Sequence, residues 1–372
     1  MKKTYSVLIV CIFVLFLAAV SVGSLVAPER TFSQMENRVL KTAPKLTEQA
    51  VMDGSYMNDA ETYLSDHILL RDFWFCVNAG LNRTLCRTDA NGVYFGRDGA
   101  LLERETTPDP ADLLKRVGYV NTLSEKTDLP IYFGLIPSAS TVWRNRLPAN
   151  AETAREDEVI AQAYDACKVK TIDVLGALND HLDEPIYFRT DHHWTPLGAR
   201  YATDALLTAM DLEPLDESEL DRETVSDSFY GTLYSKTGAF WLKPDAVERF
   251  VTDEGVSVTQ YSTMKPEPGQ LYHPELLAQK NQYNYFLGGN KPIVILNSEN
   301  APAGKVLVVR DSYCDVLAPF LTRRFSEVHL FDMRYNSLSL VSYAAEHDID
   351  AIVILYGYST FINDTSVFRI GK

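Results

Sequence analysis

The stretch KVLVVRDSYCDVLAPFLTRRFSEVHLFD, residues 305–332, contains the repeating unit of the fold. Its first residues form a valine-rich apolar run that predicts a buried strand, and the polar RDSY predicts a turn. The segment 315–325 has helical spacing, and EVHLFD at 327–332 predicts a second strand. A helix at 339–347 and a strand at 350–357 continue the pattern. Alternation of this kind predicts an α/β fold with a mostly parallel sheet.

The same alternation extends toward the N-terminus. Three further strands are predicted: PIYFGLIP (130–137), TIDVLGAL (171–178) and PIYFRT (185–190). Two helices are predicted at 153–168 and 195–210, the second with Thr195 as N-cap and Pro196 at its first position. NGVYFGRDGALLE (91–103) has the pattern of a hairpin.

Residues 214–290 break the alternation and are rich in proline, glycine, acidic residues and aromatics. We interpret them as one large insertion on the sheet, so that residues 29–372 form a single extracellular α/β domain. The aromatic side chains of the insertion either line a sugar-binding cleft or, for most of them, pack its own small core. They are Tyr230, Tyr234, Phe240, Trp241, Tyr261, Tyr272, Tyr283 and Tyr285.

The first residues, 1–28, form a separate segment. Lys2 and Lys3 are followed by an apolar run without a charge until Glu29. Such a run can span a bilayer as a helix, and the lysines favour an inside N-terminus. We therefore expect a single-pass protein of the bacterial cell membrane, with most of the chain extracellular or periplasmic. The alternative is a signal peptide cleaved near residues 21–23, since Pro28 hinders a later cleavage.

The composition limits the classes of function. The formal net charge is −15, which argues against nucleic acid and against an anionic membrane surface as partners. The five cysteines include no CxxC and no paired framework, so we expect free thiols. The sequence contains no HExxH motif and no paired cysteine or histidine spacing typical of zinc sites.

The segment DHHW, residues 191–194, is the first candidate for chemistry. In an extended chain Asp191 and His193 share one face, and His192 and Trp194 take the other. A carboxylate beside an imidazole is the pair that a general base needs. On this interpretation His192 and Trp194 mainly shape or pack the segment. The alternative is a metal site like that of DHH phosphoesterases, which needs further aspartates that the sequence does not supply.

The segment RDSY, residues 310–313, is the second candidate. It follows a predicted strand and precedes a helix, at the edge of a parallel sheet where ligands bind. A serine on such a turn is exposed, and the amides of the helix N-terminus can stabilise an oxyanion. The competing interpretation is that Ser312 is a plain helix N-cap.

These segments together resemble the DHHW protein family. The resemblance rests on TDHHWTPLGA (190–199) followed by VVRDSY (308–313), and weaker agreement covers nearly the whole extracellular part. The agreeing stretches are RTFSQMENRVL, NGVYFGRDGALL, GLIPSASTVWRNRLP, YNYFLGGN and LFDMRY. The family is similar to the SGNH-hydrolase-like domains of the alginate O-acetyltransferases of the AlgJ and AlgX type. The resemblance therefore implies a three-layer SGNH-hydrolase-like fold.

The resemblance also implies roles for individual residues. Ser312 would be the acyl-accepting nucleophile, His193 its base and Asp191 the group that orients the base. Arg310 replaces the glycine of the usual Gly-Asp-Ser block, where it either crowds the turn or holds an anionic substrate group. The candidates for oxyanion donors, which would otherwise form a simple turn, are Gly288, Gly289 and Asn290.

Three functions are compatible with these residues. The first is an envelope-anchored, serine-dependent O-acetyltransferase of an extracellular polysaccharide or cell-wall glycan. The second is a carbohydrate esterase that uses water as acceptor, and the third is a non-catalytic polysaccharide-binding or assembly component. No cofactor and no acetyl-CoA motif are expected. The resemblance implies a membrane-bound O-acyltransferase as the partner that supplies acetyl groups.

Overall fold

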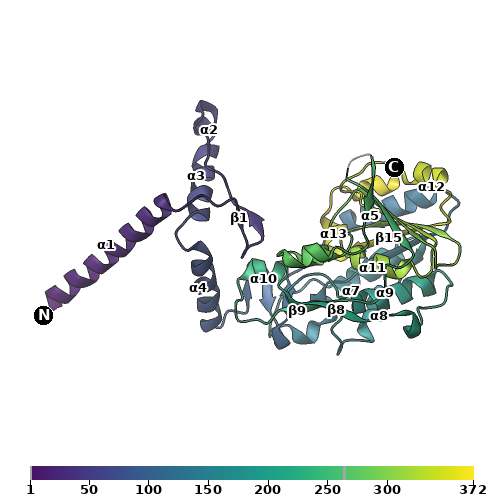
Figure 1. The fold of residues 1–372 in the computed structure, drawn as a ribbon, viewed down its shortest axis with the longest axis horizontal. Helices are drawn as coiled ribbons and strands as arrows, with labels where there is room; N and C mark the ends of the chain where they lie inside the picture. The colour runs from purple at the N-terminus through teal and green to yellow at the C-terminus, as the bar shows by residue number, and fades with distance from the viewer. Residues whose placement is uncertain (1, 263–264) are drawn as a thin grey trace. The chain divides into compact units, whose positions relative to one another are not determined.

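The computed structural model describes residues 2–262 and 265–372, which divide into two compact units (Figure 1). Unit 1 consists of Met1–Arg87 and Ser235–Trp241, and unit 2 consists of Thr88–Tyr234 and Leu242–Lys372. Unit 2 contains the main sheet and all the residues that the sequence nominates for chemistry. A short segment of the predicted insertion therefore groups with the N-terminal unit.

An eight-stranded sheet crosses unit 2 in the order β11-β10-β12-β14-β13-β15-β6-β7. The four pairings from β14 to β7 are parallel, and the three from β11 to β14 are antiparallel. The prediction of an α/β fold with a largely parallel sheet is confirmed. The strands are β6 (Ile131–Ile136), β7 (Lys170–Thr171), β10 (Val256–Tyr261), β11 (Pro266–Gly269), β12 (Ile293–Ser298), β13 (Lys305–Arg310), β14 (Glu327–Phe331) and β15 (Ala351–Gly357).

Helices cover both faces of this sheet, because its central strands are apolar on both sides. In β13, Val306 and Val308 join one buried cluster, and Leu307 and Val309 join the other. The first cluster includes α6 (Ala139–Val142), α8 (Val174–Asn179), α9 (Pro196–Ala209) and α11 (Cys314–Leu321). The second includes α5 (Pro110–Ser124), α7 (Glu156–Asp165), α12 (Leu340–Glu346) and α13 (Tyr358–Asn363). The result is three layers.

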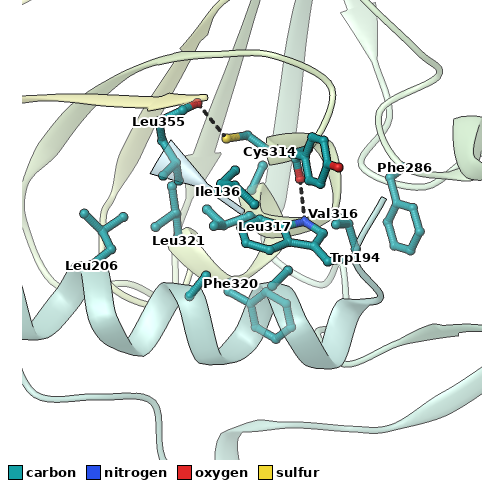
Figure 2. Close-up of a cluster of buried hydrophobic side chains, with 14 of the residues drawn as sticks. Ile136, Trp194, Leu206, Phe286, Cys314, Val316, Leu317, Phe320, Leu321 and Leu355 are labelled. Carbon is teal, nitrogen blue, oxygen red and sulfur yellow. Dashed lines mark hydrogen bonds between the residues drawn. The ribbon is translucent and has the colours of Figure 1, made fainter. Parts of the chain in front are cut away.

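The first of these clusters packs α9 and α11 against the sheet, next to the strand end that precedes Ser312. Leu206 of α9 packs with Leu317 and Phe320 of α11, under Ile136 of β6 and Leu355 of β15 (Figure 2). Each fully buried side chain of this size contributes roughly 1.5–3 kcal/mol. The helix that follows the serine is therefore held firmly against the sheet.

Smaller elements complete unit 2. The predicted hairpin is present as β4 (Val93–Phe95) and β5 (Leu101–Glu103), with β3 (Asp89–Ala90) beside it. Within the predicted insertion, β8 (Glu223–Phe229) pairs with β9 (Asp245–Arg249), whereas β10 and β11 extend the main sheet. The remaining elements are α10 (Thr232–Thr237) and the 3-10 turns Arg97–Gly99, Arg144–Arg146, Glu217–Glu219, Pro274–Ala278, Gln282–Tyr285 and Val367–Gly371.

Two predicted strands are wrong. The segment 171–178 is mostly helix, because the Asp173 side chain accepts a hydrogen bond from the Gly176 amide (2.8 Å) and so starts α8. The segment 185–190 forms only an isolated bridge between Tyr187 and Trp194. Short apolar runs do not distinguish strand from helix, and here local capping decided between them.

Unit 1 is helical. Its elements are α1 (Lys2–Val26), β1 (Phe32–Ser33), β2 (Arg38–Val39), α2 (Glu48–Met52), α3 (Ser55–Asp66) and α4 (Arg71–Thr84). Within α1, Thr4–Val26 is long and apolar enough to cross a membrane, as a signal sequence also would be. The buried Asp66 accepts hydrogen bonds from the Lys41 amide (2.9 Å) and from the Arg38 guanidinium, which ties the segment before α2 to the end of α3.

Candidate active site

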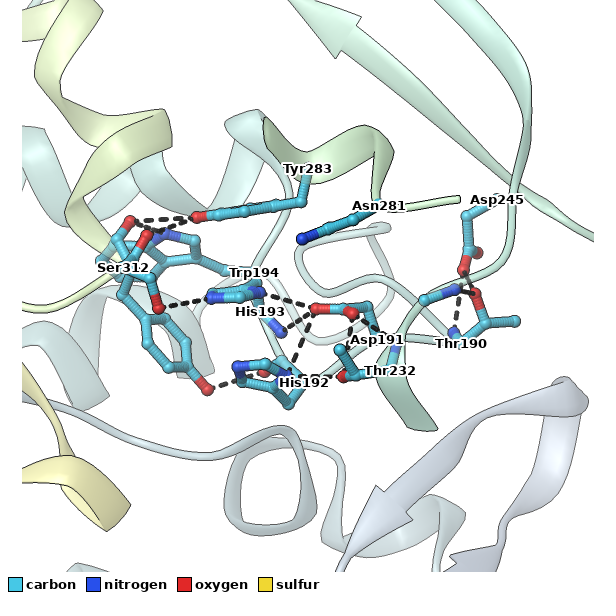
Figure 3. A network of polar contacts seen from close by, with 12 residues as sticks. Thr190, Asp191, His192, His193, Trp194, Thr232, Asp245, Asn281, Tyr283 and Ser312 are labelled. Atoms are coloured by element: carbon cyan, nitrogen blue, oxygen red, sulfur yellow. Dashed lines mark hydrogen bonds and ion pairs between the residues drawn. The ribbon is translucent and has the colours of Figure 1, made fainter. Parts of the chain in front are cut away.

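The structure brings Asp191, His193 and Ser312 into one hydrogen-bonded chain (Figure 3). The Nδ1 atom of His193 lies 2.6 Å from Oδ1 of Asp191, and its Nε2 atom lies 2.9 Å from Oγ of Ser312. A nucleophile, a base and an orienting carboxylate thus stand in the order that serine acyl chemistry needs. The tautomer follows from this arrangement: Nδ1–H donates to Asp191, and Nε2 accepts from Ser312.

Asp191 is buried and held by backbone groups. Its Oδ1 accepts from the His193 amide (3.0 Å), and its Oδ2 accepts from the Thr232 amide (2.7 Å). Gly231 packs against the carboxylate so closely that a Cβ atom there would lie 2.4 Å from Oδ2. Only glycine therefore fits at this position, and the carboxylate has one orientation.

The serine lies on the turn between β13 and α11. Asp311 fixes that turn, because its Oδ1 accepts from the Tyr313 amide (3.1 Å) and its Oδ2 from the Gly357 amide of β15 (2.9 Å). Ser312 is partly exposed, while Asp311 and Tyr313 are buried. The N-cap of α11 is Tyr313, and it makes no side-chain capping bond. The plain N-cap interpretation of Ser312 is therefore wrong, since its hydroxyl bonds to His193 instead.

Aromatic side chains enclose the base. Tyr283 stacks flat on the His193 ring, with 3.8 Å between centroids and 8° between planes, and its hydroxyl donates to the Ser312 carbonyl (2.8 Å). The fully buried Trp194 donates from Nε1 to the Tyr313 carbonyl (2.8 Å). Tyr283 thus fixes both the ring of the base and the backbone of the nucleophile (Figure 3).

Burial sets the charge state of the pair. It disfavours the imidazolium, and with the nearby charge of His192 it lowers the pKa of His193 to about 4, despite the attraction of Asp191. Burial opposes ionisation of Asp191 too, but the His192 and His193 rings and the Thr232 amide favour the carboxylate, so its pKa lies below the usual range. At neutral pH His193 is neutral and Asp191 is charged, the states that a general base and its orienting group require.

The donor set does not favour a metal ion. Asp191, His192 and His193 lie close enough to share one. However, both ring nitrogens of His193 are already engaged, and Nδ1 of His192 bonds to the Thr232 hydroxyl (2.8 Å). Binding a metal through His193 would break its bond to Asp191 or to Ser312. The geometry therefore favours the acid–base interpretation of the DHHW segment.

Arg310 is not available to a substrate. It has no exposed surface, and its NH1 atom lies 2.6 Å from Oδ1 of Asp315 in α11. Its NH1 atom also donates to the carbonyl of Asp311 (3.3 Å), so the buried side chain contacts the backbone of the serine turn from the interior. The suggestion that Arg310 holds an anionic substrate group is not supported.

The turn Gly288–Asn290 was expected to supply oxyanion donors, and this role stays a prediction. Gly288 and Gly289 both have positive φ (69° and 86°), as a tight turn requires. Asn290 accepts from Arg334 through its side-chain oxygen (3.4 Å). Within residues 2–262 and 265–372, no hydrogen bond joins this turn to Ser312 or His193.

Sequence reasoning missed several contributors. Gly231 and Thr232 support Asp191 from the predicted insertion, and Tyr283 appeared only as one of many aromatics there. Arg334 follows β14 at the same sheet edge, is partly exposed, and its charge acts on His193. The LFDMRY stretch contained a signal for Arg334, because it is a charged residue just after a strand end; nothing in the sequence marked Thr232.

A comparison with protein families identifies the chain. A model of the DHHW protein family matches residues 144–331, which include the DHHW segment and the serine turn. This chain belongs to the DHHW protein family. The matched range also includes Tyr283 and the Gly231–Thr232 support, but the N-terminal apolar helix lies outside it.

Among curated proteins, the chain is similar to two described as probable alginate O-acetylase AlgJ. The one from Pseudomonas syringae pv. tomato is 23% identical over 221 residues, which cover 56% of this chain and 54% of the relative. The one from Pseudomonas aeruginosa is 24% identical over 181 residues, which cover 45% and 46% of the two chains. This DHHW protein thus spans about half the length of the curated relatives it matches.

Solved structures share the fold. A DHHW family protein from Eubacterium siraeum superposes with a TM-score of 0.65 at 23% identity, covering 76% of this chain and 95% of the other. Bacillus cereus PatB1 with a sulfonyl adduct superposes with a TM-score of 0.63 at 19% identity, covering 74% and 97%. At these identities the likeness establishes the architecture alone.

Proposed function

We propose that this DHHW protein is an O-acetyltransferase that acts on an extracellular polysaccharide or cell-wall glycan, with Ser312 as the nucleophile. The observation that carries the proposal is the chain of hydrogen bonds from Asp191 through His193 to the partly exposed Ser312. The similarity to proteins described as probable alginate O-acetylases supports the choice of an acetyl group and a polysaccharide.

The first half-reaction forms an acetyl-serine. The Ser312 Oγ attacks the carbonyl carbon of an acetyl donor while Nε2 of His193 takes the hydroxyl proton, and Asp191 stabilises the imidazolium. The tetrahedral intermediate then expels the donor's leaving group, which receives the proton from His193. The Ser312 amide is the proposed donor to the oxyanion, because the amides of Tyr313 and Cys314 already donate to Asp311.

The second half-reaction returns the enzyme to its starting state. A sugar hydroxyl takes the place of the leaving group, and Nε2 of His193 removes its proton as its oxygen attacks the acetyl carbon. The bond to Ser312 breaks, and His193 returns the proton to Oγ. Arg334, a charged side chain at this sheet edge, is the proposed contact for the incoming glycan.

The acetyl donor must reach this site outside the cell, where acetyl-CoA is absent. We propose that α1 is a membrane anchor, and that a membrane-bound O-acyltransferase supplies the acetyl groups. An esterase would use the same residues with water in place of the sugar hydroxyl, so the acceptor distinguishes the two functions.

Mass spectrometry tests the proposal directly. The full chain in detergent is incubated with p-nitrophenyl acetate, and an acetyl adduct of Ser312 is expected together with nitrophenol release. Ser312→Ala and His193→Ala should abolish both, whereas Ser359→Ala, at an exposed serine of α13, should keep both. No adduct and no release in the wild type would contradict serine acyl chemistry. Added oligosaccharide that becomes acetylated identifies a transferase, and acetate alone identifies an esterase.

A further inference from the structure

The apolar helix α1 is joined to the rest of unit 1 by specific contacts. The Leu69 amide, between α3 and α4, donates to Oγ of Ser24 (2.8 Å), which itself donates to the Val20 carbonyl (2.7 Å). Gly23 lies against Leu69 so closely that a Cβ atom there would be 2.5 Å from the leucine side chain. A polar hydroxyl and a glycine within this helix thus match the segment that packs on it.

An aromatic contact continues along the same helix. The Trp74 ring meets Phe16 edge to face, with 6.0 Å between centroids, and its Nε1 donates to the Leu69 carbonyl (3.0 Å). Phe16 precedes Ser24 by about 12 Å along a helix. The segment 67–74, here called the elbow, therefore lies beside about the last three turns of α1 and not beyond its end.

The elbow exposes apolar side chains to its surroundings, while its charged side chains form ion pairs within unit 1. Leu70, Phe73 and Trp74 are 64%, 55% and 36% exposed. The charged groups of the same segment are engaged within unit 1: Arg71 lies 2.8 Å from Glu36, and Asp72 lies 3.0 Å from Arg30. The two ring nitrogens of His67 face the backbone carbonyl oxygens of Tyr63 (2.9 Å) and Arg30 (3.0 Å). This distribution suits a surface that meets an apolar phase.

We propose that the elbow lies in the outer interface of the lipid bilayer that α1 spans, as a second attachment of this protein to the membrane. About 17 apolar residues suffice for a span, so Thr4–Val20 can cross the hydrocarbon. Phe16 to Ser24 then lie near the outer boundary, and the elbow lies beside them. Tryptophan is enriched at that depth, and tryptophan, phenylalanine and leucine form the buried face of segments that lie in the interface.

Lipid is the occupant that the contacts favour over a soluble partner. The exposed apolar side chains belong to the segment whose Leu69 and Trp74 touch α1, so whatever surrounds the outer turns of α1 also surrounds the elbow. The inference also requires that α1 is retained after export, since removal of α1 would remove Phe16. It stands independently of the acetyltransferase proposal, because it uses no residue of unit 2.

Quenching of tryptophan fluorescence by brominated lipid tests the inference. The full chain is reconstituted into phosphatidylcholine vesicles with bromine at a shallow acyl position, and the emission of Trp74 is the difference between wild type and Trp74→Phe. We expect bromine to remove at least half of that difference. If bromine leaves the emission of Trp74 unchanged, the elbow does not lie in the lipid, and the inference is overturned.

Two further variants keep the test independent of one substitution. Phe73→Trp in the Trp74→Phe background places a new reporter on the elbow, and its emission should be quenched. Leu114→Trp in the same background is the matched control, because Leu114 is 55% exposed on α5 of unit 2. Equal quenching at positions 73 and 114 would show general contact with lipid and would also overturn the inference.

Discussion

Two histidines of unit 2 lie in nearly the same chain of hydrogen bonds. His193 stands between Asp191 (2.6 Å) and the Ser312 hydroxyl (2.9 Å), and His329 stands between Glu327 (2.6 Å) and the Tyr343 hydroxyl (2.8 Å). Burial lowers the pKa of both imidazoles. Distances alone therefore do not distinguish a catalytic site from a structural cluster.

The difference lies in what surrounds each chain. Ser312 is partly exposed on a turn at the carboxyl edge of the sheet, whereas Tyr343 is buried within α12 and His329 within β14. Asp191 is held by amides, while Glu327 is also near Lys305 (3.5 Å). A reactive chain needs a hydroxyl that a substrate can reach. Of the two chains, that of His193 ends in such a hydroxyl and that of His329 does not.

Removing the carboxylate charge from each cluster in turn should give the largest difference in kcat between the two. We expect Asp191→Asn to lower kcat for p-nitrophenyl acetate by about 10⁴-fold, because the asparagine no longer holds the tautomer or stabilises the imidazolium. Glu327→Gln is the matched control and should leave kcat within about twofold. A similar loss of kcat in both variants would mean that the two clusters act together, and would contradict the assignment of the His329 cluster as structural. Thermal unfolding should be measured on each protein to exclude loss of the fold.

The pH dependence of the reaction tests the environment of His193. Since burial lowers its pKa to about 4, we expect kcat/KM to be constant across neutral pH and to fall about tenfold per unit below pH 4. The value of kcat/KM falls at low pH because protonated His193 cannot accept the serine proton. A midpoint of the pH profile near 6.5 would contradict the burial of His193 and would indicate an imidazole open to water.

Much of this site follows from local sequence, and the rest does not. The DHHW segment and the strand-to-helix turn predicted Asp191, His193 and Ser312, since each is a short-range pattern. Gly231, Thr232 and Tyr283 come from an insertion without periodicity, so only tertiary packing brings them to the base. The burial of Arg310 was equally hidden, because it depends on which way β13 presents the side chain.

Tyr283 offers a finer test. It stacks flat on His193 and bonds to the Ser312 backbone, whereas no ring in the described part of the chain stacks flat on His329. Tyr283→Phe keeps the stack and loses the bond to the Ser312 carbonyl, worth about 1 kcal/mol, so kcat should fall about fivefold with KM unchanged. Tyr283→Leu also exposes the ring of His193 and should move the acid limb upward from pH 4. A change in KM alone would assign Tyr283 to substrate binding instead of positioning.

Tyr343→Phe should have the smallest effect on the reaction and therefore sharpens the comparison. It removes the hydroxyl that bonds to Nδ1 of His329, the counterpart of Ser312 in the second chain. Because an unpaired buried nitrogen is costly, we expect the free energy of unfolding to fall by about 1 kcal/mol in urea denaturation, with the rate of ester cleavage unchanged. A loss of rate at full stability would show that the interior cluster acts on the site through β14, which ends beside β13 at the edge that carries the serine turn.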